Sequence, residues 1–205
     1  LSMSILIGVL AAGVSAVMAL ILGICAATLG KKVDSAISFA IDTVMGIPHI
    51  LLLILISYAM GKGLKGVIAG VALTHWTSLA RLIRGEVMQL RESEYIQIAG
   101  KLGLGKWEIA KKHIVPHVLP QFIVGLVLLF PHAILHESSI TFLGFGLSTE
   151  QPAIGVILSE SMRYLIMGKW WLAVFPGMML VLTVVLFEKG GTALRQLLDP
   201  GSVHK

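Results

Sequence analysis

Two histidines and a glutamate lie in one long apolar run, where such side chains could bind a metal ion or line a path. His132 and His136 are four residues apart within the segment Pro131–Ser139, and Glu137 follows directly. A four-residue spacing places both imidazoles on one face of a helix. Neutral imidazoles bind nickel, copper and zinc. We predict that His132, His136 and Glu137 line a substrate path and that the two histidines bind metal. The alternative is that these histidines only form hydrogen bonds between helices.

An enzyme is a poor match for these residues. The zinc-peptidase motif His-Glu-x-x-His places its glutamate between the histidines, whereas Glu137 follows both. The sequence also contains no nucleophile–base pair and no Gly-x-x-x-x-Gly-Lys-Ser/Thr loop for nucleotide phosphates. We therefore predict a chain that is not an enzyme and binds no cofactor of its own.

A charged segment, Arg91–His117, interrupts the apolar sequence. Gly103 and Gly105 favour a turn and predict a short amphipathic helix on each side. Ser93 can cap the first helix, and Pro116 is predicted to end the second. A basic, structured loop between apolar segments indicates a docking site for a partner.

This loop resembles that of permease subunits of binding-protein-dependent ABC importers. The family pattern is Glu-Ala-Ala, three residues, Gly, nine residues, then Ile-x-Leu-Pro. In this sequence Ala99, Gly103 and Pro116 match, and the departures are Gln97, Ile98, His113 and, mildly, Val115. Two further segments, Ser139–Gly146 and Leu198–Pro200, are similar to the peptide and nickel branch of these importers. The resemblance thus covers nearly the whole chain.

The resemblance implies a type I ABC importer permease fold over residues 1–205, with a cytoplasmic coupling loop at 94–116. It implies ATPase docking through Ala99, Gly103, Leu104, Trp107 and Pro116, with Leu102 and Ile109 as further apolar anchors. The implied partners are a second permease subunit in a heterodimer, two ATPase subunits that bind ATP and magnesium, and an extracytoplasmic substrate-binding protein. The implied location is a prokaryotic inner membrane.

The nickel branch is favoured for the cargo. Its members also show a His-x-x-x-His run, as at His132 and His136, and a segment like Thr74-His75-Trp76. We therefore expect this chain to form half of the path for nickel or a nickel chelate. A dipeptide or oligopeptide importer is the alternative. A secondary transporter that needs no ATP is a remote alternative, because the two halves of the sequence show no inverted repeat.

Composition independently predicts an all-α membrane protein. Hydrophobic residues make up 56% of the chain and charged residues 13%, where a soluble domain has about 25% charge. Runs of about 20 apolar residues predict five spans. They cover residues 3–29, 36–60, 67–83, 118–140 and 170–187. Pro48 predicts a kink in the second span. Family members usually have six spans, so we expect another before residue 1.

The distribution of basic residues predicts the orientation. With Lys31 and Lys32 in the cytoplasm, twelve of the sixteen lysines and arginines fall on that side. The other four are Lys62, Lys65, Arg163 and Lys169. The net charge of +5 is therefore explained by topology and anionic lipid, and no nucleic-acid partner is expected. In the first span, small residues every three or four positions predict a face for close helix packing.

Overall fold

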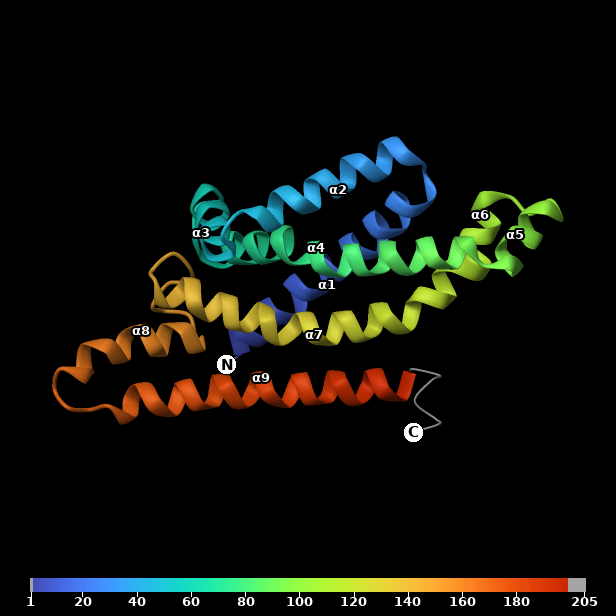
Figure 1. Ribbon diagram of the computed structural model, residues 1–205. Helices are drawn as coiled ribbons and strands as arrows, with labels where there is room; N and C mark the ends of the chain where they lie inside the picture. The colour runs from blue at the N-terminus through green and yellow to red at the C-terminus, as the bar shows by residue number, and fades with distance from the viewer. Residues whose placement is uncertain (1, 199–205) are drawn as a thin grey trace.

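The computed structural model describes residues 2–198, all of whose regular structure is helical (Figure 1). Asp199, Pro200 and Lys205, which entered the predictions above, lie outside the described residues. The helices are α1 (Ser2–Thr28), α2 (Lys31–Gly46), α3 (His49–Ala59), α4 (Gly63–Glu92), α5 (Glu94–Lys101), α6 (Lys106–Ile109), a π-helical turn (Ala110–Ile114), α7 (Val115–Phe142), α8 (Ile154–Leu165) and α9 (Trp171–Leu198). This confirms the all-α prediction.

Helix α1 packs across α4 and α7 through its small residues. A Cβ atom at Gly8 would lie 2.8 Å from the Phe130 ring, and one at Gly23 would lie 2.9 Å from the backbone oxygen of Ala80. Ser15 donates a 3.1 Å hydrogen bond to the carbonyl of Ala72. The small-residue face therefore allows close helix packing, as predicted.

Four helices are long and apolar enough to cross a membrane: α1, α4, α9 and the helical segment Trp107–Phe142 that includes α7. They correspond to the first, third, fifth and fourth predicted spans. The second predicted span is not one kinked helix. It consists of α2 and α3, whose axes differ by 99° across a short break. Pro48 explains the break, because it lacks a donor N–H and forces Ile47 into an extended conformation, at ψ 137°.

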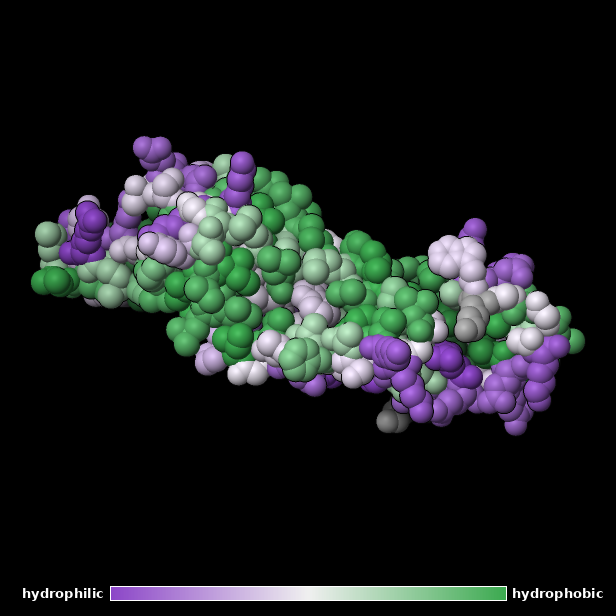
Figure 2. Space-filling view, turned by 90° about the horizontal axis from the view of Figure 1, so that it is seen from above, coloured by the Kyte–Doolittle hydropathy of each residue, from purple (hydrophilic) through white to green (hydrophobic). Residues whose placement is uncertain are grey.

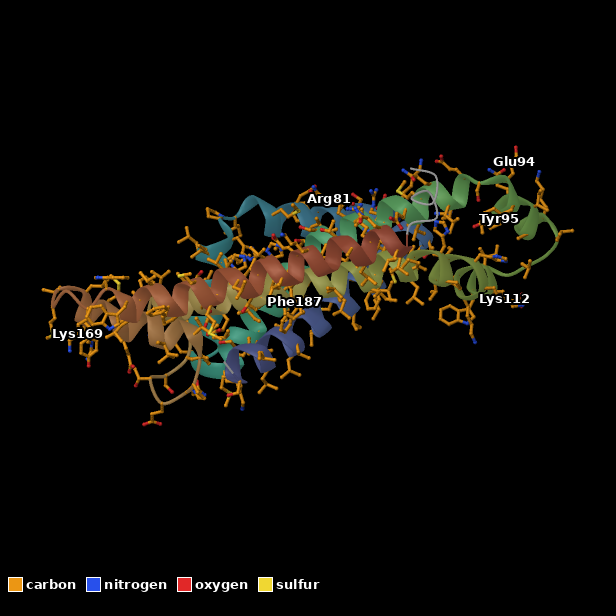
Figure 3. The ribbon with its side chains drawn as sticks, turned by 90° about the horizontal axis from the view of Figure 1, so that it is seen from below. Arg81, Glu94, Tyr95, Lys112, Lys169 and Phe187 are labelled. Carbon is orange, nitrogen blue, oxygen red and sulfur yellow. The ribbon has the colours of Figure 1, made fainter. Side chains whose placement is uncertain are left out.

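Hydrophilic residues gather toward the ends of the elongated molecule on this face, and hydrophobic residues cover much of its middle (Figure 2). Lys169 lies at the end opposite Glu94, Tyr95 and Lys112, as Figure 3 shows. Near the end with Glu94 and Tyr95, Arg91 donates a hydrogen bond to the backbone oxygen of Ala27. Lys169, predicted to be external, and the predicted cytoplasmic loop with Lys112 thus lie at opposite ends.

Helix α8 packs against α7 and α9. Helix α9 buries only Gly191 among its residues. Its apolar side chains, such as Phe175 and Leu182, remain exposed within this chain. Such a surface requires lipid or another protein around it.

Candidate functional site

A cavity of about 650 Å³ lies between α4, α7 and the junction of α2 with α3. Both predicted histidines of α7, His132 and His136, line it, as their spacing on one helix face requires. Its other polar lining comes from His49, Thr74, His75, Thr77 and Ser78. The cavity therefore combines side chains from helices that are far apart in the sequence.

Three of these histidines form a compact cluster. The ring centroids of His49 and His75 are 4.6 Å apart, those of His49 and His136 are 4.5 Å apart, and those of His75 and His136 are 4.9 Å apart. One ring nitrogen from each lies within 4.8 Å of the others. His132 lines the same cavity but is exposed and stands outside this group. The structure thus groups His136 with His49 and His75 instead of with His132.

Two histidines of the cluster are positioned by different local features. His49 is the first residue of α3, directly after the break at Pro48. His75 is fixed on α4 because its Nδ1 lies 3.0 Å from the carbonyl oxygen of Val71 and 3.1 Å from the hydroxyl of Thr74. Sequence reasoning predicted a kink at Pro48 and did not propose the next residue, His49, as a site residue. Its position after a proline break, as a polar residue in an apolar run, was the available signal.

Glu137 lies apart from the histidines with which we grouped it. It is fully buried and is not among the residues that line the cavity. Its carboxyl group accepts a 3.0 Å hydrogen bond from the hydroxyl of Thr141 and a 3.4 Å bond from that of Ser138. The Thr141 hydroxyl in turn accepts from the backbone N–H of Leu147, at 3.2 Å. Glu137 therefore stabilises the turn after α7.

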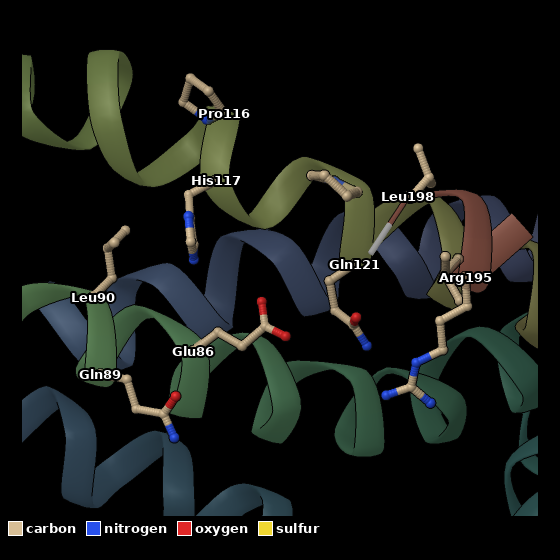
Figure 4. Close-up of a pocket in the computed structure, with 10 residues that line it drawn as sticks. Glu86, Gln89, Leu90, Pro116, His117, Gln121, Arg195 and Leu198 are labelled. Carbon is tan, nitrogen blue, oxygen red and sulfur yellow. The ribbon is translucent and has the colours of Figure 1, made fainter. Parts of the chain in front are cut away.

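A second cavity, of about 570 Å³, lies farther along α4 and α7, next to the end of α9. Figure 4 shows the side chains of Glu86, Gln121 and Arg195 directed into this space, with His117 above it. The cavity thus combines a carboxylate, a guanidinium and an amide. Sequence reasoning missed it, because these residues belong to three separate helices and match no motif.

The charged loop contains the two predicted helices, α5 and α6, separated by the turn at Gly103, whose φ is +90°. Ser93 occupies the N-cap position of α5, but its hydroxyl bonds to the carbonyl of Leu90 and caps no amide. Pro116 does not end the second helix. It lies in the first turn of α7, directly after the π-helical turn Ala110–Ile114, and helical structure continues from Trp107 to Phe142.

The predicted docking residues differ in their exposure. Leu102 and Trp107 are exposed at 78% and 80% of their surfaces, respectively, so they are available to a partner. Ala99 is buried, and Leu104 and Ile109 are partly buried. The backbone N–H of Leu104 bonds to the carbonyl of Ala99, at 3.2 Å, and so fixes the turn. Two groups of residues therefore exist in this loop, one that holds its shape and one that faces outward.

The fold is that of the membrane subunits of ABC importers. A subunit of the MetNI methionine ABC transporter, in an inward-facing conformation, superposes with a TM-score of 0.78 over 96% of this chain and 93% of that one, at 16% sequence identity. A chain of an amino acid ABC transporter superposes with a TM-score of 0.69. Residues 19–202 match the family described as binding-protein-dependent transport system inner membrane component. The chain belongs to this family, and it is therefore an inner-membrane protein.

The relatives found in sequence comparisons include several peptide permeases. The dipeptide transport system permease protein DppC of Bacillus subtilis is 32% identical over 96% of this chain and 62% of its own length. OppC, the oligopeptide permease protein of the same organism, is 32% identical over 96% of this chain and 64% of its own. The probable D,D-dipeptide permease protein DdpC of Escherichia coli is 29% identical. The chain spans about two thirds or less of the length of these relatives. These relatives favour the peptide alternative. The comparisons do not confirm nickel as the cargo.

Proposed function

We propose that this chain is the membrane-spanning part of a permease subunit in an ABC importer of dipeptides or oligopeptides. The observation that carries this proposal is the similarity, over nearly the whole chain, to permease proteins of dipeptide and oligopeptide systems. This proposal replaces nickel, the cargo that we first expected, with the peptide alternative.

The two cavities support a path along α4 and α7. Each falls within the range of about 300–1,000 Å³ that is typical of small-molecule sites. A short peptide carries an ammonium group, a carboxylate and several amides. Glu86 and Arg195 provide opposite charges on two sides of the second cavity, and Gln121 provides an amide. Such a lining can accept both peptide termini without requiring a particular side chain.

The loop of α5 and α6 supports coupling to separate ATPase subunits. Exposed apolar side chains on a short helix are typical of helix-in-groove recognition, and Leu102 and Trp107 provide them. In the proposed assembly the ATPase subunits bind ATP and magnesium. A second permease subunit completes the path, and a substrate-binding protein delivers the peptide.

An uptake experiment tests the cargo. The complete transporter would be expressed in cells that lack their own peptide and nickel importers. Uptake of a radiolabelled dipeptide, a tetrapeptide and ⁶³Ni²⁺ would then be measured. We expect peptide uptake that disappears when the ATPase subunits carry an inactivated nucleotide site. Uptake of nickel without uptake of either peptide would overturn the proposal.

A further inference from the structure

We propose that His49, His75 and His136 form a binding site for one divalent transition-metal ion of the zinc type. The proposal goes beyond peptide transport and does not depend on it, because metal binding can be measured on the purified permease.

The site joins three separate helices at one point. His49 begins α3, His75 lies within α4, and His136 lies within α7. The three rings approach edge to face or tilted, at interplanar angles of 75°, 59° and 70°, so none stacks flat on another. In this arrangement one nitrogen of each ring can point to a common centre, which a flat stack of rings would prevent.

Each histidine of the cluster has one buried ring nitrogen without a hydrogen-bond partner. Nε2 of His49, Nε2 of His75 and Nδ1 of His136 are all buried without one in this chain. Buried polar atoms are normally paired, because an unpaired one loses its hydrogen bonds to water without replacement. Three unpaired nitrogens in a single cluster therefore point to a bound metal ion, which can accept one lone pair from each of them.

The hydrogen bonds of His75 leave one of its ring nitrogens free to bind a metal ion. The carbonyl oxygen of Val71 can only accept, so the ring proton of neutral His75 lies on Nδ1. Its buried Nε2 then carries a free lone pair. Metal-binding histidines commonly donate their second N–H to a backbone carbonyl in this way, which fixes the tautomer and the ring orientation.

The chemistry of the lining selects the kind of ion. The residues that line the cavity, all of them in the described part of the chain, include no aspartate or glutamate. Calcium and magnesium require oxygen ligands, whereas imidazole favours zinc, nickel, cobalt and copper. Three histidines leave a fourth coordination position open, as in zinc sites that bind water or another ligand. Here that position would face the cavity.

The spacing of the rings implies a small closure on binding. Two nitrogens bound to the same zinc ion at about 2.0 Å lie about 3.3 Å apart. The nitrogens of the cluster are separated by up to 4.8 Å. Binding therefore draws His49, at the start of α3, toward α4 and α7.

Cobalt and zinc test the site on the purified permease in detergent. Co²⁺ is the first probe, because its visible absorption distinguishes four-coordinate from six-coordinate sites. Zn²⁺ affinity is then measured by equilibrium dialysis, after treatment with a chelator. We expect one ion per chain and intense four- or five-coordinate absorption. We also expect at least an approximately 10-fold loss of affinity in each of His49→Gln, His75→Gln and His136→Gln.

His132→Gln is the matched control, because this residue lines the same cavity outside the cluster. It should bind zinc as the unaltered protein does. A loss in His132→Gln as large as that in His136→Gln would overturn the three-histidine assignment. Zinc binding by a variant that carries all three substitutions, His49→Gln, His75→Gln and His136→Gln, equal to that of the unaltered protein would also overturn the assignment. Unchanged elution in size-exclusion chromatography shows that each variant is folded, and a variant that fails it is replaced by the corresponding His→Asn.

Discussion

His136 and Glu137 are neighbours in α7, yet their polar atoms have opposite surroundings. The carboxyl group of Glu137 accepts hydrogen bonds from Ser138 and Thr141 and is completely buried. Nδ1 of His136 is also buried but has no partner and belongs to a cluster beside a cavity. A buried polar group that is fully paired stabilises the fold. One that is unpaired is a candidate for binding something from outside the chain.

The loop that contains α5 and α6 shows the same difference for apolar groups. Ala99 is buried within the chain, whereas Trp107, eight residues later, is 80% exposed. A large exposed aromatic side chain contributes little to folding, but it can dominate an interface. Contacts that are complete within the chain and contacts that are left for a partner can therefore be distinguished residue by residue.

Trp107→Ala should show the largest effect. If Trp107 is a docking anchor, its removal should weaken ATPase binding by about 2 kcal/mol, roughly 30-fold, and reduce peptide uptake accordingly. The thermal stability of the permease alone should not change. Co-purification of the ATPase subunits and uptake would be measured. Glu108→Gln is the control, because its exposed ion pair with Lys112 contributes little. Normal ATPase binding by Trp107→Ala would contradict the docking role.

Glu137→Ala should destabilise the fold by about 1–3 kcal/mol, because the hydroxyls of Thr141 and Ser138 lose their acceptor inside the protein. Glu137→Gln should cost less, since its amide oxygen can still accept. Thermal unfolding in detergent gives the comparison. The exposed Glu150→Ala is the control. If Glu137→Ala unfolds at the same temperature as the unaltered protein, the structural role assigned to Glu137 is wrong.

His136→Leu should change stability by less than about 1 kcal/mol, because the nitrogen that it removes has no partner within the chain. The same unfolding measurement, made without added metal, checks this expectation. A loss of stability equal to that of Glu137→Ala would erase the difference between the two neighbours.

Arg81→Ala should have the smallest effect. Arg81 pairs with Asp42, and the two side chains are exposed at 51% and 67%. Such exposed pairs contribute about 0–1 kcal/mol, less at high salt. Arg84→Ala removes the less exposed pair with Asp34 and should cost more. The two unfolding temperatures would be compared at low and high salt, and a larger loss for Arg81→Ala would contradict this ranking.

Local patterns predicted much of the fold. Apolar runs identified four of the spans, and the spacing of small residues identified the face through which α1 packs. The predicted end of a helix at Pro116 was wrong, because a proline is equally compatible with the first turn of a helix.

The site was less predictable, because it depends on contacts between distant segments. The four-residue spacing correctly placed His132 and His136 on one face of α7. It could not show that His49 and His75 meet only one of them, since that depends on how α3 is oriented after the break. Nor could it show that Glu137 is enclosed by the turn after α7. Side chains that match a helical period can still face different neighbours.

The break between α2 and α3 also separates two ways of holding a helix in place. Helix α3 is held by close contacts: the hydroxyl of Ser57 donates to the carbonyl of Phe145, at 2.8 Å, and Gly66 lets the start of α4 pack against Ser57. Helix α2 lies beside the cavity with Val44 and Met45, and its Asp34 and Asp42 pair with Arg84 and Arg81 of α4. One wall of the cavity is therefore attached by ion pairs that salt can screen, whereas α3 is attached by packing that salt leaves intact.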